Sequence, residues 1–475
     1  MTMFNDDFFN EDEFNDFDNL INEFFKMKNG EVHQLIQEDD FEYLIDYFMI
    51  NNEKENLIYA CEKAVSLYPF STELLIRQAE CYIAQKKYGQ ALITIDRIEE
   101  ISPNNIDAVF LKSDILIEQN RFVEASKILE HNIENFEGDE KAEILIELSE
   151  IYDELNEYKK VYHSLKKVLL FQPKNEEALL RICFWAEISN MQEDSIELHQ
   201  NIIDEHPYNV LAWYNLGVAY QGLKLYEKAI DAYSYCVAID DKFEYAYRNM
   251  GDAYIKLKKF KQAIEVLETH LNITKAEDVI LDAIAYCWDK QKEYSKARHY
   301  YRKASQLNPQ DDQFFFKIGE TYSKEGQWEK AIKAYSVALH HNKNNVSYCL
   351  ALGNCLMEIG AEKDALVCYL NAVQLRPDIK STWQSLIRAL YLTQYFDEAL
   401  SQIEIAIDHC GYKVEFDYYK AAILLAKGKT KDATLQLEEA LAKNPKKINS
   451  LNFLNKELLM HPAFSNIIVR YKKKK

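Results

Sequence analysis

The chain has 475 residues, of which 48% are hydrophobic and 28% are charged, and its formal net charge is −21 at pH 7. No apolar run approaches the roughly 20 residues that a membrane-spanning helix needs, and the first residues lack the basic and apolar regions of a secretory signal. We therefore expect a cytoplasmic protein without a membrane span. Its nine cysteines contain no Cys-x2-Cys pair and are expected to be reduced rather than bound to zinc or paired in disulfides.

Residues 1–37 are expected to lie outside the repeats that fill the rest of the chain. The first 25 residues contain seven Phe and eight acidic residues but no basic residue, a mixture typical of segments that become ordered only on a partner. We expect residues 1–15 to be disordered and residues 16–36 to form a helix that covers the first repeat. Alternatively, the acidic N-terminus occupies the chain's own binding surface until a partner displaces it.

Residues 38–209 divide into five degenerate units of 34 residues, each predicted to contain two helices. A two-residue insertion, Glu140-Lys141, is the only break in this spacing. Residues 1–209 carry 18 Lys and Arg against 45 Asp and Glu, a balance of −27, whereas residues 210–475 have a balance of +6. This polarity indicates either a solvated acidic surface or two halves that bind different partners.

Residues 210–447 continue the 34-residue spacing through seven more regular units. Position 8 of these units is small in all but one unit, and position 20 is always Ala: Gly217, Gly251, Ala285, Gly319, Gly353, Ile387 and Ala421 at position 8; Ala229, Ala263, Ala297, Ala331, Ala365, Ala399 and Ala433 at position 20. Small side chains at these positions allow two helices to approach closely. Residues 448–461 are predicted to form a single capping helix that ends at Pro462, and residues 462–475 a basic tail.

The first regular unit carries a recognisable motif. Its apolar and small residues follow the spacing W-x2-L-G-x2-Y…A-x3-Y, with Trp213, Leu216, Gly217, Tyr220, Ala229 and Tyr233. This pattern resembles the tetratricopeptide-repeat family, and the resemblance covers about 410 residues. It implies an all-α solenoid, namely a right-handed superhelix of about twelve helix–turn–helix units with a C-terminal capping helix. It also implies that the first helices line a concave groove that binds peptides or partner helices.

The resemblance implies that positions 2, 5, 6, 9, 12 and 13 of each first helix face this groove. In residues 38–209 many of these positions are acidic, among them Asp39, Glu42, Asp46, Glu80, Asp114, Glu147, Glu150 and Asp153. An acidic groove would attract a basic segment of a partner and repel nucleic acid. The alternative is that these carboxylates form an ordinary solvated face.

The later repeats place other residue types at the same positions: Tyr214, Asn215, Tyr245, Arg248, Asn249, Asp252, Tyr286, Lys317, Asn354 and Arg388. Tyr and Arg are favoured at binding hot spots because they combine contact area with a polar group. Asn215 and Asn249 share one position in successive units. They resemble the asparagine ladder of O-linked N-acetylglucosamine transferases, whose side-chain amides bind the backbone of an extended peptide. Alternatively, both amides contact solvent or neighbouring helices.

The sequence contains none of the common nucleotide-binding, metalloprotease or hydrolase motifs. No stretch of 60 or more residues lies outside the repeats, so we expect no catalytic residues, no cofactor and no metal. The expected function is a non-catalytic scaffold for protein–protein interactions, and its expected partners are other proteins. RNA binding by the more basic later half is an alternative that the interleaved acidic residues disfavour.

Overall fold

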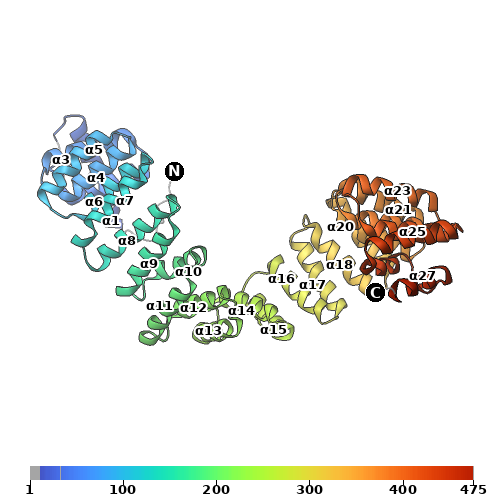
Figure 1. Ribbon diagram of the computed structural model, residues 1–475. Coiled ribbons are helices and arrows are strands. Elements are labelled where there is room, and N and C mark those ends of the chain that lie inside the picture. Colours follow the sequence, from blue (N-terminus) through green and yellow to red (C-terminus); the bar gives the residue numbers. More distant parts are fainter. Residues whose placement is uncertain (1–10, 33, 474–475) are drawn as a thin grey trace. The chain divides into compact units, whose positions relative to one another are not determined.

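The computed structural model describes residues 11–32 and 34–473 (Figure 1). All regular secondary structure among these residues is helical, and successive helices are stacked as hairpins, which confirms the all-α solenoid. No helix in the described part of the chain is long and apolar enough to cross a membrane. The chain divides into two compact bodies, which we call the N-terminal body (Met1–Asp240) and the C-terminal body (Asp241–Lys475), and we describe each by itself.

In the N-terminal body, α1 (Glu11–Lys28) precedes pairs of a first and a second helix. The first helices are α2 (Glu38–Ile50), α4 (Thr72–Ala84), α6 (Ile106–Glu118), α8 (Gly138–Glu154), α10 (Glu176–Ile188) and α12 (Val210–Gly222). The second helices are α3 (Lys54–Leu67), α5 (Tyr88–Ile101), α7 (Phe122–Asn132), α9 (Tyr158–Phe171), α11 (Gln192–Glu205) and α13 (Tyr226–Ile239).

The C-terminal body continues the same alternation. Its first helices are α14 (Glu244–Lys256), α16 (Asp278–Lys290), α18 (Asp312–Lys324), α20 (Val346–Glu358), α22 (Lys380–Leu392) and α24 (Val414–Ala426). Its second helices are α15 (Phe260–Ile273), α17 (Tyr294–Leu307), α19 (Trp328–His341), α21 (Glu362–Leu375), α23 (Phe396–Cys410) and α25 (Thr430–Lys443).

The turn inside each pair has one recurring backbone feature. Position 15, just after each first helix, has a positive φ: Asn52, Lys86, Asn120, Asn156, Asn190, Lys224, Lys258, Lys292, Gly326, Gly360, Gln394 and Gly428. A residue in the left-handed region ends an α-helix and turns the chain back. The second helix therefore begins after a very short turn and packs against the first.

The small residues at position 8 have the predicted role. A Cβ atom on Gly217 would lie 2.4 Å from the ring of Tyr233, which is fully buried in the partner helix. A Cβ on Gly319 would lie 2.5 Å from Tyr335 in the same way. The alanines at position 20 of the regular repeats are also completely buried. Glycine at position 8 therefore provides the space that a large side chain of the second helix fills, a Tyr ring at Gly217 and Gly319 and Leu267 at Gly251.

Helix α1 lies against the first pair of helices. The ring of Phe24 is fully buried, with its centroid 4.8 Å from that of Phe48 in α2 and 5.8 Å from that of Tyr59 in α3. A helix covering the first repeat was expected from residue 16, but α1 already begins at Glu11. Extending an existing helix costs little compared with starting one, which explains the longer helix. Residues 1–10, also expected to be disordered, lie outside the described residues.

The two-residue insertion is accommodated inside a helix. Glu140 and Lys141 belong to α8, which starts at Gly138 rather than at the expected Ala142. The preceding second helix, α7, is correspondingly short and is followed by a 3-10 turn, Ile133–Asn135. From Tyr158 onward the helices return to the 34-residue spacing.

The C-terminus differs from the single capping helix predicted for residues 448–461. The structure has a 3-10 segment η2 (Pro445–Ser450), a short α26 (Leu451–Leu454), a second 3-10 segment η3 (Lys456–Met460) and then α27 (Pro462–Lys473). Asn455 is extended and its side chain accepts a hydrogen bond from the Glu457 N–H at 2.9 Å, so the helix stops there and restarts. Pro462 begins a helix instead of ending one, as proline readily does. Most of the expected basic tail is therefore helical.

Candidate functional site

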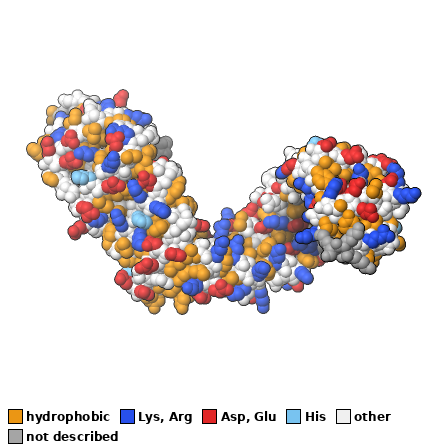
Figure 2. Space-filling model, viewed as in Figure 1, with side chains coloured by type: hydrophobic (Ala, Val, Ile, Leu, Met, Phe, Trp, Pro, Cys, Tyr) orange, Lys and Arg blue, Asp and Glu red, His pale blue; other side chains and the backbone are white. Residues whose placement is uncertain are grey.

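The first helices of neighbouring repeats contact one another through the positions predicted to face a groove. In the N-terminal body, Arg77 of α4 lies 3.3 Å from Asp46 of α2, and Arg181 of α10 lies 3.0 Å from Glu150 of α8. In the C-terminal body, the Lys317 ammonium lies 2.6 Å from Asp282. Within each body these positions therefore form one surface, which we call the first-helix surface. Acidic and hydrophobic side chains are interspersed on the face of the N-terminal body seen in Figure 2.

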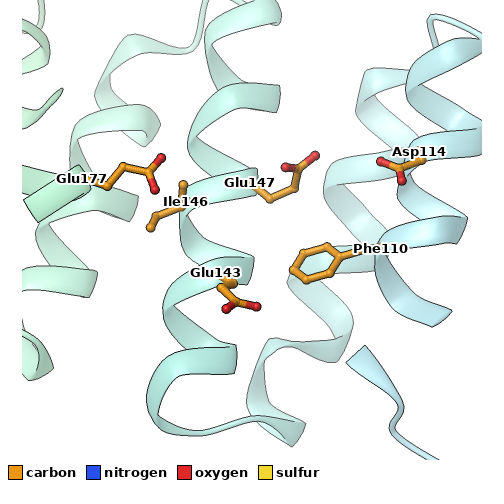
Figure 3. Close-up of a pocket in the computed structure, with 6 residues that line it drawn as sticks. All are labelled: Phe110, Asp114, Glu143, Ile146, Glu147 and Glu177. Atoms are coloured by element: carbon orange, nitrogen blue, oxygen red, sulfur yellow. The ribbon is translucent and has the colours of Figure 1, made fainter. Parts of the chain in front are cut away.

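A hollow of about 340 Å³ opens on this surface between α6, α8 and α10 (Figure 3). Phe110 and Ile146 form its apolar part, and four carboxylates surround them: Asp114, Glu143, Glu147 and Glu177. In Figure 3, Asp114 and Glu147 project into the space between α6 and α8. The hollow thus combines an apolar floor with a concentration of negative charge.

The carboxylates of the hollow repel one another. Burial raises the pKa of Glu147, and the negative charges of Glu150 and Asp114 raise it further. Burial also raises the pKa of Asp114, together with the charges of Glu118 and Glu80. No ion pair among the described residues involves Asp114, Glu143 or Glu147. A cation bound here would relieve this repulsion.

The remaining acidic residues predicted to bind a partner differ in their surroundings. Asp46 and Glu80 both pair with Arg77, at 3.3 and 3.2 Å, and Glu150 pairs with Arg181. These two arginines therefore compensate part of the acidic charge beside the hollow, and Arg181 also pairs with Glu177 of the hollow itself.

Three further carboxylates lie toward the edges of the same surface. Asp39 and Asp153 are exposed. Burial, followed by the charges of Glu73 and Asp39, raises the pKa of Glu42. Repulsion between carboxylates therefore extends from the hollow to the first repeat.

Asn215 does not face a partner, contrary to the sequence prediction. Its side chain is only 1% exposed, and its amide donates a hydrogen bond of 2.7 Å to the carbonyl of Leu179 in the preceding first helix. The amide is thus used to join two repeats. Asn249, the second residue of the predicted ladder, is partly buried. At Asn215 the structure therefore agrees with the alternative to the ladder, a bond to a neighbouring helix.

Tyr245 and Tyr286 are 55% and 39% exposed on the first-helix surface of the C-terminal body. Arg248 is exposed at the same surface and lies 3.8 Å from Glu277. Both rings also make contacts within the chain, Tyr245 with Phe243 and Tyr286 with Lys290, so only their exposed parts and the Arg248 cation are accessible.

The other residues predicted to bind partners already make contacts within the chain. Lys317 is held by Asp282, and Asn354 accepts a hydrogen bond of 2.7 Å from the Tyr369 hydroxyl. Tyr214 and Asp252 are partly buried, and the Tyr214 ring lies 5.9 Å from that of Tyr233.

The C-terminal segment covers the last part of this surface. Phe453 of α26 lies 5.4 Å from the Arg388 guanidinium of α22 and 6.2 Å from the ring of Tyr419 in α24. In α24, burial raises the pKa of Glu415, but hydrogen bonds from its own backbone and from Lys447 and Lys380 lower it to about 2. Arg388 is therefore occupied by the chain itself, a contact that sequence spacing did not indicate.

Helix α10 also carries an exposed apolar stripe that was not predicted. Leu180, Phe184 and Ile188 are 62%, 56% and 41% exposed, and they occupy positions 5, 9 and 13 of this helix. The signal was present in the sequence, since these are positions expected to face a partner. The nine cysteines are free, and no cluster of His, Cys, Asp or Glu among the described residues could hold a metal ion.

Comparison with known proteins identifies the repeats. Family models described as "Tetratricopeptide repeat" match residues 210–243, 246–278 and 288–346. A model described as "Anaphase-promoting complex, cyclosome, subunit 3" matches residues 51–132. No curated protein is significantly similar in sequence to this chain.

Several solved structures are similar in fold. YrrB, described as a TPR protein with an unusual peptide-binding site, is 18% identical, with 41% of this chain and 97% of YrrB covered at a TM-score of 0.35. The C-terminal part of a TPR repeat-containing protein from Cytophaga hutchinsonii is 18% identical, with 51% and 99% covered at 0.44. An APC/C hetero-tetramer is 13% identical, with 89% and 96% covered at 0.33.

Proposed function

We propose that this chain, a tetratricopeptide-repeat protein, is a non-catalytic scaffold. It binds segments of other proteins on its first-helix surface. The observation that carries this proposal is the hollow between α6, α8 and α10. It is a recess with an apolar floor, and three of its four carboxylates, Asp114, Glu143 and Glu147, have no ion-pair partner within the described chain, whereas Glu177 pairs with Arg181. Buried or half-buried charges of one sign are unfavourable unless a partner compensates them.

A basic segment fits the hollow chemically. Lys and Arg side chains have an aliphatic stem, which Phe110 and Ile146 can cover, and a cationic end, which the surrounding carboxylates can bind. Next to the hollow, two arginines of the chain already bind carboxylates of the same surface: Arg77 pairs with Asp46, and Arg181 pairs with Glu150. A cation of the partner bound at the hollow would add one more ion pair to this row of ion pairs along the surface.

The C-terminal body offers a second, different surface. Tyr245 and Tyr286 expose their rings, and Arg248 adds a cation that is only partly engaged by Glu277. We propose that this part contacts a segment with apolar and acidic groups, because aromatic rings and arginine are the usual anchors of such contacts. Self-regulation by the N-terminus would require Phe24 to leave the first repeat, on which its ring is buried.

Crosslinking in lysate, followed by identification of the bound proteins, tests the proposed function. The variant Asp114→Lys/Glu147→Lys places two cations at the hollow and should lose partners that the unmodified chain retains. The control Asp204→Lys/Glu205→Lys makes the same charge change on exposed residues of α11 and should retain them. Binding should also weaken with added salt. Recovery of the same partners with both variants would rule out the hollow as the binding site.

A filter-binding assay at low salt tests the RNA-binding alternative. We expect no retention of RNA, because acidic residues are interleaved with the basic ones in residues 210–475, whose charge balance is only +6, and would repel phosphate groups. Retention that falls with salt and is lost when Arg248 is replaced by Glu would instead favour an RNA-binding protein.

A further inference from the structure

Helix α10 is apolar on two faces but is covered on only one. Ile182, Trp185 and Ala186 are at most 8% exposed and belong to the core of the N-terminal body. Leu180, Phe184 and Ile188 follow one another at intervals of four residues, so they form a second stripe along the helix. All three are exposed by 41% or more. A helix with two apolar faces usually has a partner on each.

The stripe of α10 continues a row that runs across neighbouring helices. Position 5 of successive first helices is apolar: Ile76 in α4, Phe110 in α6, Ile146 in α8 and Leu180 in α10. Phe110 and Ile146 are the floor of the hollow. We call these four residues, together with Phe184 and Ile188, the apolar strip.

Acidic residues flank the apolar strip on both sides. Position 2 of the same four helices is always acidic, with Glu73, Asp107, Glu143 and Glu177. Position 9 is acidic in the first three, with Glu80, Asp114 and Glu150. Arg77 and Arg181 compensate part of this charge, but Asp114 and Glu143 have no ion pair within the described chain. An occupant should therefore be apolar along its centre and basic at its edges.

We propose that the apolar strip binds a basic amphipathic α-helix of a partner protein; this inference rests on the scaffold function proposed above. The exposed side chains of α10 repeat every four residues, about 6 Å along the helix axis, which matches the spacing of apolar residues at i and i+4 of a packed helix. Lys and Arg on either side of the partner's apolar stripe would meet the acidic rows.

An extended peptide fits this surface less well than a helix. An extended backbone needs hydrogen-bond partners for its N–H and C=O groups, whereas a helix satisfies its own. The amide that could have bound such a backbone next to α10 is that of Asn215, and it is bonded to the carbonyl of Leu179. The chain's own first ten residues are also unsuitable, because they contain Asp6 and Asp7 but no basic residue.

A labelled peptide and the full-length chain test the proposal by fluorescence anisotropy. The peptide contains Leu and Lys arranged as an amphipathic helix. One control peptide has the same composition in scrambled order, and another has a central proline that breaks the helix. We expect the amphipathic peptide to bind at least about tenfold more tightly than either control, since only it can place its apolar stripe on the strip. Equal binding of the proline peptide would overturn the helical partner.

Matched variants locate the binding site. Leu180→Ser/Phe184→Ser should weaken peptide binding at least about tenfold, through the lost apolar contact. Leu170→Ser is the control, because Leu170 of α9 is 64% exposed, much like Leu180, but lies on a second helix. Peptide affinity unchanged in the double variant would overturn the inference.

Two further results separate this inference from the proposed function. If lysate partners depend on Asp114 and Glu147 but not on Leu180 and Phe184, the scaffold function stands and the apolar docking fails. If the unmodified chain sediments as a dimer and the Leu180→Ser/Phe184→Ser variant as a monomer, a second copy covers the strip and the proposed partner is wrong.

Discussion

His199 provides a test of the packing in the N-terminal body. It lies in α11 and is completely buried, and its Nδ1 atom is 2.7 Å from the carbonyl oxygen of Ser195. A carbonyl oxygen can only accept a hydrogen bond, so the ring proton is on Nδ1. The buried Nε2 has no hydrogen-bond partner among the described residues. Burial lowers the pKa of His199 to about 4, although the bond to Ser195 opposes this. A second proton would have to enter an apolar site without an acceptor.

The lowered pKa makes stability depend on pH. Between the folded value of about 4 and the ordinary 6.5, the unfolded chain binds a proton that the folded chain does not. The neutral His199 ring therefore makes its full contribution to the free energy of unfolding above about pH 6.5, and this contribution is lost as the pH falls toward 4. The full difference corresponds to about 3 kcal/mol of unfolding free energy, of which about 2 kcal/mol is lost by about pH 5.

The variant His199→Leu should remove this dependence. Position 24 of the preceding repeat is Leu165, which is fully buried, so the fold accepts leucine at this place. Urea unfolding followed by circular dichroism, near neutral pH and near pH 5, should show that the unmodified chain loses about 2 kcal/mol more than the variant. His131→Leu, on an exposed residue of α7, is the control and should behave like the unmodified chain. An equal acid-induced loss in all three proteins would refute the reasoning.

Three other substitutions test local features of the fold. Gly217→Ala places a Cβ 2.4 Å from the buried Tyr233 ring and should cost about 1–3 kcal/mol in thermal unfolding; unchanged stability would mean that the ring yields. Lys224→Gly removes a side chain at φ 61° and should add about 0.5–1 kcal/mol, and a loss of stability would contradict the strain argument. Phe24→Ala removes the ring packed on Phe48 and should cost about 3 kcal/mol and expose α1 to protease; α1 as resistant as before would show that it does not depend on Phe24.

The repeat spacing predicted the fold to single residues over most of the chain. The first helix of the regular part begins at Val210 and its partner at Tyr226, in the register that the glycine and alanine positions required. This succeeds because the same packing constraint recurs in each repeat, so a weak pattern in one is reinforced by the others. The close approach of Gly217 to Tyr233 has the same origin.

The details of the binding surface were harder to predict. Spacing shows that Asn215 lies on a given side of its helix, but it does not show that the amide reaches the Leu179 carbonyl of the preceding repeat. Similarly, residues 448–461 have helical spacing, but Asn455 bonds to the backbone just ahead of it and ends the helix. In both cases a polar side chain can form a hydrogen bond either with the backbone nearby in sequence or with a distant residue, and the sequence does not show which bond forms. The exposed Leu180, by contrast, could have been found from its position in the repeat.

The two terminal helices cover the apolar sides of the first and last pairs of helices, where another molecule could otherwise pack. Phe24 of α1 fills the open side of the first pair, and Phe464 of α27 is completely buried where α27 packs on α25. An uncovered end of such an array presents the same apolar side as any internal junction, and would accept the end of another molecule. The packing of α1 and α27 on the first and last pairs therefore opposes end-to-end association of the repeats. Growth in that direction would require α1 or α27 to detach first.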